Sequence, residues 1–342
     1  MKINKFITAL SLGAIVMGFS SCKNGEIDFP DSDSGTTAYF AYQYPIRTLI
    51  LGNVETYDNT SDNEGRFTIY GTSGGSYNGI NAKITVKVDE SLIDGLKFED
   101  GTNVTMMPAD YYTISGATLD YAGQFRGGVE IKLTDKFFAD PEAMNLKYVI
   151  PVVMTDFTGV DSVLRGEPLD ASKATPRQDL ESWNILAKDY TIFAVNYINK
   201  YTATYLRRGV DKLGDSTIVR HKAFIEKDEV VTTTTKAMNK ISMVIGNIVK
   251  DSVPVDCELV LTFNDNGECT IESPTAGFTV SGTGKYVQGD AKKAWGNKDR
   301  DALYLDYTLT LGTDVYKTKD TLVWRDRGTA PSIREYKPTY FK

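Results

Sequence analysis

The segment Cys257-Glu-Leu-Val-Leu-Thr-Phe263-Asn-Asp-Asn-Gly-Glu-Cys-Thr-Ile271 indicates the fold class most directly. Cys257, Leu259, Leu261 and Phe263 recur with a period of two, which places them on one face of a β-strand. Asp265-Asn266-Gly267 is typical of a three-residue hairpin loop with glycine in the left-handed position. Cys269 and Ile271 then return to the same apolar face. The segment therefore predicts an antiparallel hairpin in which Cys269 lies opposite Phe263.

This register decides the state of the two cysteines. Cys257 lies six residues along the strand from Phe263, a separation of roughly 20 Å at ~3.3 Å per residue. A disulfide requires Cα atoms within ~7 Å of each other. We therefore predict that Cys257 and Cys269 are unbridged and act as small buried apolar residues.

The same period of two extends over most of the chain. Between residues 37 and 157, apolar and polar residues alternate in short runs separated by Gly and Asp clusters, as in a β-sandwich. Residues 161–189 break the pattern, because Gly166, Pro168 and Pro176 interrupt a charged stretch. Alternation resumes at Tyr190 and predicts eight or nine antiparallel strands, enough to close a small barrel. No βαβ alternation occurs, so we expect an all-β protein.

Composition limits the classes of function. The 342 residues suffice for about two domains, and 41% hydrophobic with 24% charged residues is an ordinary globular balance. The net charge of −7 gives no electrostatic basis for binding nucleic acid. The sequence has one histidine, His221, so histidine-rich metal sites and most histidine acid–base chemistry are excluded.

The N-terminus has the pattern of a bacterial lipoprotein signal. Lys2 and Lys5 precede an apolar stretch that ends Phe19-Ser20-Ser21-Cys22, which is too short for a membrane span. We predict that residues 1–21 are a signal peptide, that Cys22 is lipidated, and that residues 22–36 form a tether. Acids soon after Cys22 resemble a surface-export signal, so we expect an outer-membrane protein that faces the cell exterior. The alternative is an ordinary signal peptide with an incidental Cys22.

Known catalytic motifs do not fit the chain. Gly71-Thr-Ser-Gly-Gly75 matches the hydrolase pattern G-x-S-x-G, but that chemistry requires a following helix and a histidine base, and neither is predicted nearby. We therefore predict a protein that is not an enzyme and needs no cofactor or metal site, although a surface calcium site is left open.

The loop around Trp295 is the predicted binding site. Gly289 and Gly296 place Trp295 in a polar loop, where an exposed ring could stack on a sugar while nearby polar groups bind its hydroxyls. The alternative role of Trp295 is packing or anchoring of the loop. The predicted ligand-binding residues are Trp295, Asn297, Asp299 and Arg300.

Several runs resemble a known family of surface lipoproteins. The first four resemble an N-terminal domain of unknown function that is common in Bacteroidetes, and the last two resemble the opening of a lipocalin-like partner domain, with Thr202-Ala203 where that opening often has His-Gly. The runs are Ala82–Asp89, Met107–Tyr112, Gly128–Leu133, Tyr148–Val153, Asn199–Tyr201 and Tyr205–Gly209.

The resemblance implies a fold and a function. It implies an immunoglobulin-like β-sandwich over residues 37–160, a connecting segment over 161–189 and a lipocalin-like antiparallel β-barrel over 190–342. It also implies a cell-surface protein of a polysaccharide-utilisation system. We therefore expect a non-catalytic lipoprotein that binds glycans, with the membrane and outer-membrane uptake proteins as partners. The alternative is a structural or adhesive surface lipoprotein that binds other proteins.

Overall fold

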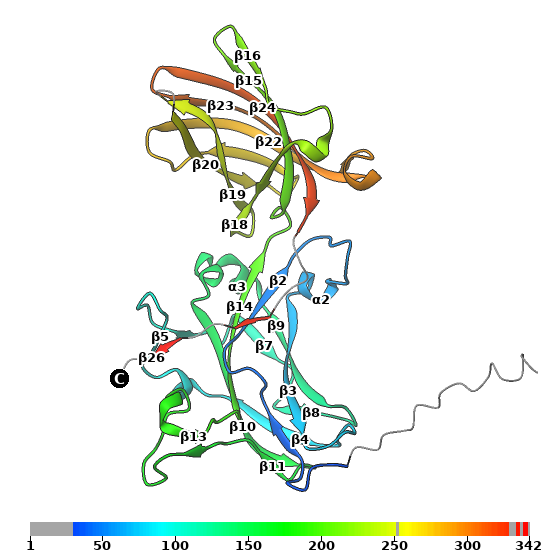
Figure 1. Ribbon diagram of the computed structural model, residues 1–342, viewed down its shortest axis with the longest axis vertical. Coiled ribbons are helices and arrows are strands. Elements are labelled where there is room, and N and C mark those ends of the chain that lie inside the picture. The colour runs from blue at the N-terminus through cyan, green and yellow to red at the C-terminus, as the bar shows by residue number, and fades with distance from the viewer. Residues whose placement is uncertain (1–29, 251–252, 328–332, 336–337, 341–342) are drawn as a thin grey trace, which may run out of the picture.

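The described part of the chain forms two large β-sheets placed end to end, and the helices within it are short (Figure 1). This computed structural model describes residues 30–250, 253–327, 333–335 and 338–340. The predicted all-β class is confirmed. The predicted signal peptide, Cys22 and residues 22–29 of the predicted tether lie outside the described residues.

The first sheet contains twelve strands in the order β11-β1-β3-β9-β8-β4-β10-β14-β2-β25, with β6 beside β10 and β7 beside β9. Their bounds are β1 Thr37–Tyr39, β2 Pro45–Ile50, β3 Arg66–Gly74, β4 Lys83–Val88, β6 Thr105–Met106, β7 Tyr112–Ile114, β8 Thr118–Asp120, β9 Arg126–Leu133, β10 Tyr148–Thr158, β11 Ser162–Val163, β14 Tyr190–Ile198 and β25 Ile333–Glu335.

This first sheet folds over on itself and encloses a core. Phe67 of β3 stacks on Phe193 of β14 with ring centroids 5.3 Å apart, although four strands separate β3 from β14 in the sheet order. The inward-facing members of the period-two runs, such as Ile84, Ile131 and Val152, are fully buried between the two layers. The alternation read in the sequence therefore identifies the core face of these strands.

Small elements flank the first sheet. Two further pairs are β12 with β13 and β5 with β26. The bounds of the flanking elements are β5 Leu96–Lys97, β12 Glu167–Pro168, β13 Trp183–Ile185, β26 Thr339–Tyr340, α2 Thr60–Asn63, α3 Asp135–Ala139, η2 Glu90–Ile93, η3 Pro141–Asn145 and η4 Leu180–Ser182.

The second sheet contains ten strands in the order β16-β15-β24-β23-β22-β21-β20-β19-β18, with β17 also beside β15. Its bounds are β15 Thr204–Leu213, β16 Ser216–Val219, β17 Glu229–Thr232, β18 Thr234–Ala237, β19 Lys240–Lys250, β20 Val253–Phe263, β21 Glu268–Glu272, β22 Phe278–Ala291, β23 Arg300–Leu311 and β24 Asp314–Asp326, with η5 Ile225–Lys227 and η6 Trp295–Asn297 in its loops.

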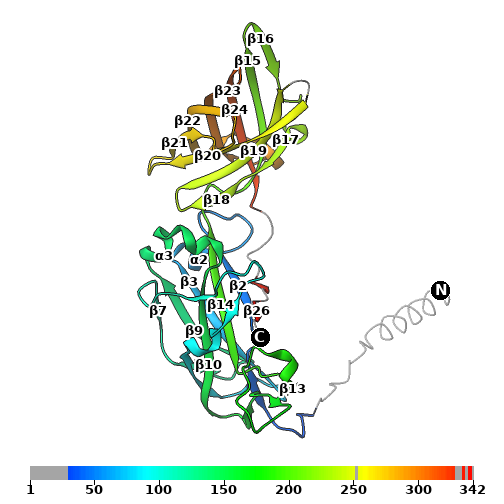
Figure 2. The ribbon, with the colours of Figure 1, turned by 90° about the vertical axis from the view of Figure 1, so that its left-hand side faces the viewer.

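The second sheet curves into a half-barrel, which Figure 2 shows from the side. The consecutive strands β17 and β18 connect its two edges, because β17 pairs with β15 and β18 pairs with β19. At the bend between them, the Thr233 amide donates a 3.0 Å hydrogen bond to the Ala203 carbonyl. Pairing at both edges protects strands that would otherwise be open to association.

The division between the sheets differs from the predicted boundary at residue 190. Strand β14, Tyr190–Ile198, pairs with β10 and β2 of the first sheet, and the second sheet begins only at Thr204. The chain also returns to the first sheet at its end, where β25 pairs with β2. Alternation shows that a segment is a strand but does not show which sheet provides its hydrogen-bonding partners.

The hairpin register predicted from the sequence is confirmed. Phe263 pairs with Cys269, and Cys257 and Cys269 are both buried and free. Burial raises the pKa of the Cys269 thiol to about 12, and it also raises the pKa of the Cys257 thiol. Both side chains are therefore neutral core residues rather than nucleophiles.

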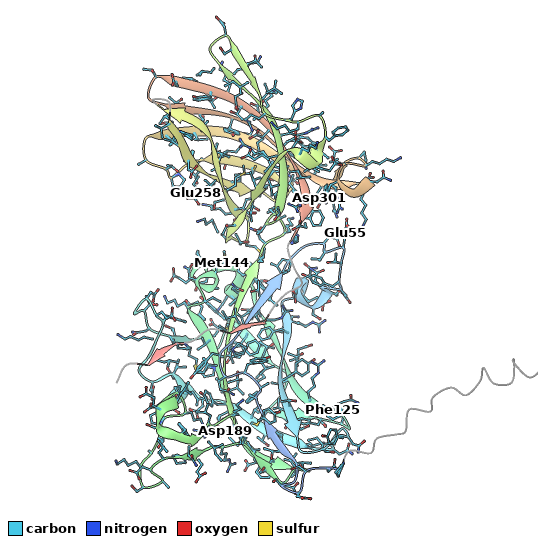
Figure 3. All side chains as sticks on the ribbon, in the orientation of Figure 1. Glu55, Phe125, Met144, Asp189, Glu258 and Asp301 are labelled. Carbon is cyan, nitrogen blue, oxygen red and sulfur yellow. The ribbon has the colours of Figure 1, made fainter. Side chains whose placement is uncertain are left out.

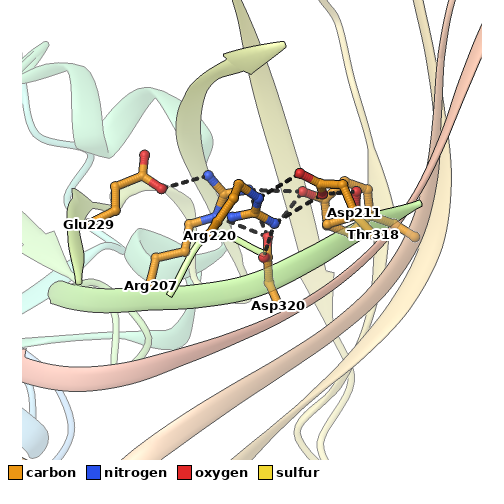
Figure 4. A network of polar contacts seen from close by, with 7 residues as sticks. Arg207, Asp211, Arg220, Glu229, Thr318 and Asp320 are labelled. Atoms are coloured by element: carbon orange, nitrogen blue, oxygen red, sulfur yellow. Dashed lines mark hydrogen bonds and ion pairs between the residues drawn. The ribbon is translucent and has the colours of Figure 1, made fainter. Parts of the chain in front are cut away.

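A buried ionic network links strands β15, β17 and β24 of the half-barrel (Figure 4). Arg207 of β15 is fully buried and contacts both Asp320 of β24, at 2.8 Å, and Glu229 of β17, at 2.9 Å. Arg220 binds the other Asp320 oxygen at 2.5 Å and also pairs with Asp211 at 2.6 Å. Burial by itself lowers the pKa of Arg207, but the charge of Asp320 holds this pKa above its usual value.

The network predicts an asymmetric effect of two aspartate substitutions. Asp320→Ala removes the fully buried carboxylate that both Arg207 and Arg220 contact and leaves Arg207 with Glu229 alone, so we expect the free energy of unfolding to fall by about 3–5 kcal/mol. Asp306→Ala is the control, because Asp306 pairs with Lys319 on the exposed face of the same sheet and such pairs contribute little. Urea denaturation of both variants measures the difference, and equal stabilities would contradict the role assigned to the network.

The cysteines give a second prediction. In a Cys22→Ala protein, Cys257 and Cys269 should not react with a thiol reagent at pH 8 under native conditions, because burial holds both thiols neutral and inaccessible. Both should react fully once urea unfolds the chain. Fewer than two thiols in urea would indicate a disulfide and contradict the hairpin register.

Candidate functional site

Trp295, Asn297 and Asp299 of the predicted ligand-binding residues lie in the loop between β22 and β23, and Arg300 is the first residue of β23, close to the place where the two sheets meet. Trp295 is half-buried in the short turn η6, whereas Asn297 is exposed and has a left-handed φ of 56°. Asp301 holds the base of the loop by accepting a 2.9 Å hydrogen bond from the Gly289 amide. The structure therefore brings the predicted residues together on a fixed loop.

Arg300 has a structural partner, Glu55, in the loop between β2 and α2. Its side chain is largely buried, and its Nη1 donates to Glu55 at 3.2 Å while its Nε donates to the Trp295 carbonyl at 3.0 Å. Lys298 binds the same Glu55 carboxylate at 3.1 Å. Figure 3 shows Glu55 at the level where the two sheets meet. Arg300 therefore connects the Trp295 loop to the loop that follows β2 of the first sheet.

Trp295 and Asp299 also have local partners. The guanidinium of Arg325 lies over the Trp295 ring, 5.8 Å from its centroid. Asp299 accepts hydrogen bonds from the Lys293 amide and the Lys292 ammonium, and these bonds hold the pKa of Asp299 below its usual value. These contacts fit the alternative role of Trp295 as a loop anchor, while leaving part of its ring exposed.

A groove of about 930 Å³ crosses the outer face of the half-barrel. It follows the row of paired residues Phe263, Cys269, Gly284, Leu305 and Asp320. The side chains of this row face the interior, so their neighbours on either side project outward and line the groove. The outward residues are Thr262, Asn264, Glu268, Thr270, Thr283, Lys285, Tyr304, Asp306, Lys319 and Thr321.

The side chains of this outer groove combine one aromatic ring with many hydrogen-bonding groups. Lys319 and Asp306 form an exposed ion pair at 3.0 Å, and Lys285 lies 3.7 Å from Glu268. Exposed pairs of this kind cost little to rearrange, so their charged groups can turn toward a ligand. The threonine hydroxyls can donate as well as accept.

Tyr304 is the aromatic ring of the outer groove. Its side chain is 37% exposed, and its hydroxyl donates a 2.7 Å hydrogen bond to Asp290. This hydrogen bond raises the pKa of Tyr304 to about 12, so the phenol remains protonated at neutral pH. Because Asp290 belongs to the Trp295 loop region, Tyr304 links that region to the groove.

Sequence reasoning did not find the outer groove. Period-two alternation assigns Tyr304, Asp306 and Thr283 to the solvent face of their strands, but nothing in one strand shows that the solvent face is hollow. The curvature of a sheet depends on all its strands together. The only local signal was an outward aromatic between outward charges, and many exposed strands share that pattern.

Among residues 30–250, 253–327, 333–335 and 338–340, no group of three or more His, Cys, Asp or Glu side chains could hold a metal ion. In the described part of the chain, no helix combines the length and apolar character needed to cross a bilayer.

Two families of known domains match separate parts of the chain. Residues 200–328 match a family described as a domain of unknown function, DUF5627, and residues 32–161 match a family of N-terminal domains. No curated protein matches the chain.

Two solved structures from Bacteroides align with most of the chain. A protein of unknown function from Bacteroides ovatus is 37% identical, with a TM-score of 0.83 over 91% of this chain and 100% of its own. An auxiliary nutrient-binding protein from Bacteroides thetaiotaomicron is 16% identical, with a TM-score of 0.35 over 81% of this chain and 90% of its own. The similarity to the nutrient-binding protein is too low to carry an argument about this chain. The identity and coverage of the first comparison show that the chain belongs to the same family as the Bacteroides ovatus protein of unknown function.

Proposed function

We propose that this protein is a non-catalytic, lipid-anchored surface protein that binds glycans in the outer groove of its second sheet. The observation that carries the proposal is the groove itself, in which Tyr304 lies among carboxylates, ammonium groups and threonine hydroxyls. A sugar presents hydroxyls that such groups bind and an apolar C–H face that packs on an aromatic ring. The immunoglobulin-like and lipocalin-like descriptions of the two domains are part of this proposal.

The dimensions of the outer groove favour an extended ligand. It crosses five strands, β20 to β24, which is roughly 19 Å at about 4.8 Å between strands. Several sugar rings in a row fit that length, whereas a small cofactor is usually enclosed on most sides. The open groove and its exposed ion pairs therefore suit a polysaccharide chain that binds from solution.

The position of the outer groove agrees with an accessory role in polysaccharide uptake. The half-barrel lies at one end of the long axis, and the described chain begins near the opposite end (Figure 1). A protein anchored through Cys22 would therefore present the groove away from the membrane. Uptake proteins of the outer membrane would receive the bound glycan.

We expect Tyr304→Ala to weaken glycan binding roughly tenfold, because the lost ring contact of ~60 Å² corresponds to about 1.5 kcal/mol. Titration with a polysaccharide selected from a binding panel measures the change. Tyr42→Ala is the matched control, since Tyr42 is a tyrosine of the loop between β1 and β2, 54% exposed and outside the groove.

A comparison with Trp295→Ala decides between the two candidate positions. A site centred on the outer groove predicts a larger loss of affinity for Tyr304→Ala than for Trp295→Ala, and the reverse order would return the site to the Trp295 loop. If no polysaccharide binds but a surface protein is captured with defined stoichiometry, the adhesive alternative replaces the glycan proposal.

The lipid anchor has its own test. Cys22→Ala should move the protein from the membrane fraction to the soluble fraction, because acyl chains on Cys22 would supply the membrane affinity. Fractionation in high salt removes peripheral attachment, and mass spectrometry of the wild-type N-terminal peptide identifies the acyl groups. Retention of the Cys22→Ala protein in the membrane under these conditions would contradict the anchor.

A further inference from the structure

Exposed aromatic rings gather at the end of the first sheet that is farthest from the half-barrel. Tyr77 is 62%, Phe125 50% and Tyr70 48% exposed. The guanidinium of Arg126 lies 4.5 Å from the centroid of the Tyr70 ring. We call Tyr70, Tyr77, Phe125 and Arg126 the aromatic end. Figure 3 shows Phe125 at this end of the molecule.

The backbone that carries these rings is held in place. The Ser73 amide donates to the Phe125 carbonyl at 3.0 Å, and the Ile80 amide donates to the Gln124 carbonyl at 3.1 Å. At Gly79 the two loops approach so closely that a Cβ atom would lie 1.8 Å from the Gly123 carbonyl oxygen. The exposed rings are therefore displayed on two loops that brace each other.

The N-terminal segment joins the structure at the aromatic end. The Tyr77 amide donates to the Asp31 carboxylate at 3.0 Å, and the Ser32 amide donates to the Gly75 carbonyl at 2.8 Å. Nine residue steps separate Cys22 from Asp31, and a fully extended chain of that length spans at most roughly 30 Å. An acyl group on Cys22 therefore holds this end of the protein close to the bilayer.

We propose that the aromatic end lies in the interfacial layer of the lipid bilayer to which Cys22 is anchored. The inference rests on the lipid anchor of the proposed function. Tyrosine and phenylalanine rings suit this layer, since their apolar bodies enter the acyl boundary and the tyrosine hydroxyl remains hydrated. The tether keeps the aromatic end near the bilayer and so gives it a high effective concentration there. Weak contacts of the individual rings are then enough to hold the aromatic end in the interfacial layer.

The charges beside the aromatic end indicate the kind of lipid. Asp31, Asp33 and Asp161 are exposed near the point where the chain enters, whereas Arg126 contributes one positive charge. An anionic surface repels such an acidic rim. The aromatic end should therefore contact a bilayer of neutral, zwitterionic lipids more closely than one rich in anionic lipids.

The test replaces the natural anchor with an artificial one. A protein that begins at residue 23 carries an N-terminal polyhistidine tag and binds phosphatidylcholine vesicles that contain a nickel-chelating lipid. An environment-sensitive dye is attached through Phe125→Cys or, separately, through Tyr77→Cys. Ile218→Cys provides the matched control, because Ile218 is also exposed, at 44%, but lies on β16 of the half-barrel. The buried Cys257 and Cys269 should not take up the dye.

We expect severalfold brighter, blue-shifted emission at positions 125 and 77 on vesicles, with quenching by spin-labelled lipid, and no change at 218. Adding Tyr77→Asp to the Phe125→Cys protein should reduce the quenching, and anionic lipid should weaken it. Equal, water-like signals at 125, 77 and 218 would overturn the docking. The lipid anchor is tested separately, by the mass of the acyl groups on Cys22. The artificial tether does not depend on that anchor, so failure of the docking and failure of the anchor can be distinguished.

Discussion

The relative position of the two sheets depends on a small group of polar contacts between them. The carboxylate of Glu55, in the first part of the chain, receives both Lys298 and Arg300 from the half-barrel. Arg327 adds a second connection, because its guanidinium donates to the carbonyls of Leu51 and Lys200. The guanidinium is partly removed from water, and this burial lowers the pKa of Arg327. Together with the chain crossings on either side of the half-barrel, these contacts place the outer groove at one end of the molecule and the aromatic end at the other.

Within the half-barrel, a buried charge limits how the strands can pack. Arg207 is fully buried and requires carboxylates, which β24 and β17 supply. The approach is so close that a Cβ atom on Gly209 would lie 2.0 Å from an Asp320 oxygen, so only glycine fits there. Such a network adds little stability over an apolar core. However, any packing of the strands that separates a buried arginine from its carboxylates is strongly destabilised. The network therefore favours one register of β15 against β24.

The proposed activities need no reactive group. The groove offers a ring, hydroxyls and exposed ion pairs for the proposed binding, and the cysteines are neutral members of the core. In the proposed arrangement the first sheet is a spacer between the bilayer and the ligand, and the bracing of its loops positions the aromatic rings. The two proposed surfaces would bind through different interactions. The outer groove relies on many directional hydrogen bonds, whereas the aromatic end relies on the non-directional hydrophobic effect, as its rings transfer out of water.

The sequence by itself determined the class of fold and much of the local geometry. Alternation predicted strands and their core faces, and the Asp265-Asn266-Gly267 loop fixed the register of Phe263 against Cys269, because a short hairpin is controlled by residues that are neighbours in the chain. Tertiary structure alone decided that β14 joins the first sheet, that Arg300 binds Glu55 and that the outer face of β20 to β24 is hollow. Each of these depends on residues distant in sequence, since the partner of a strand, the counter-ion of a buried arginine and the curvature of a sheet are set only when separate segments pack together.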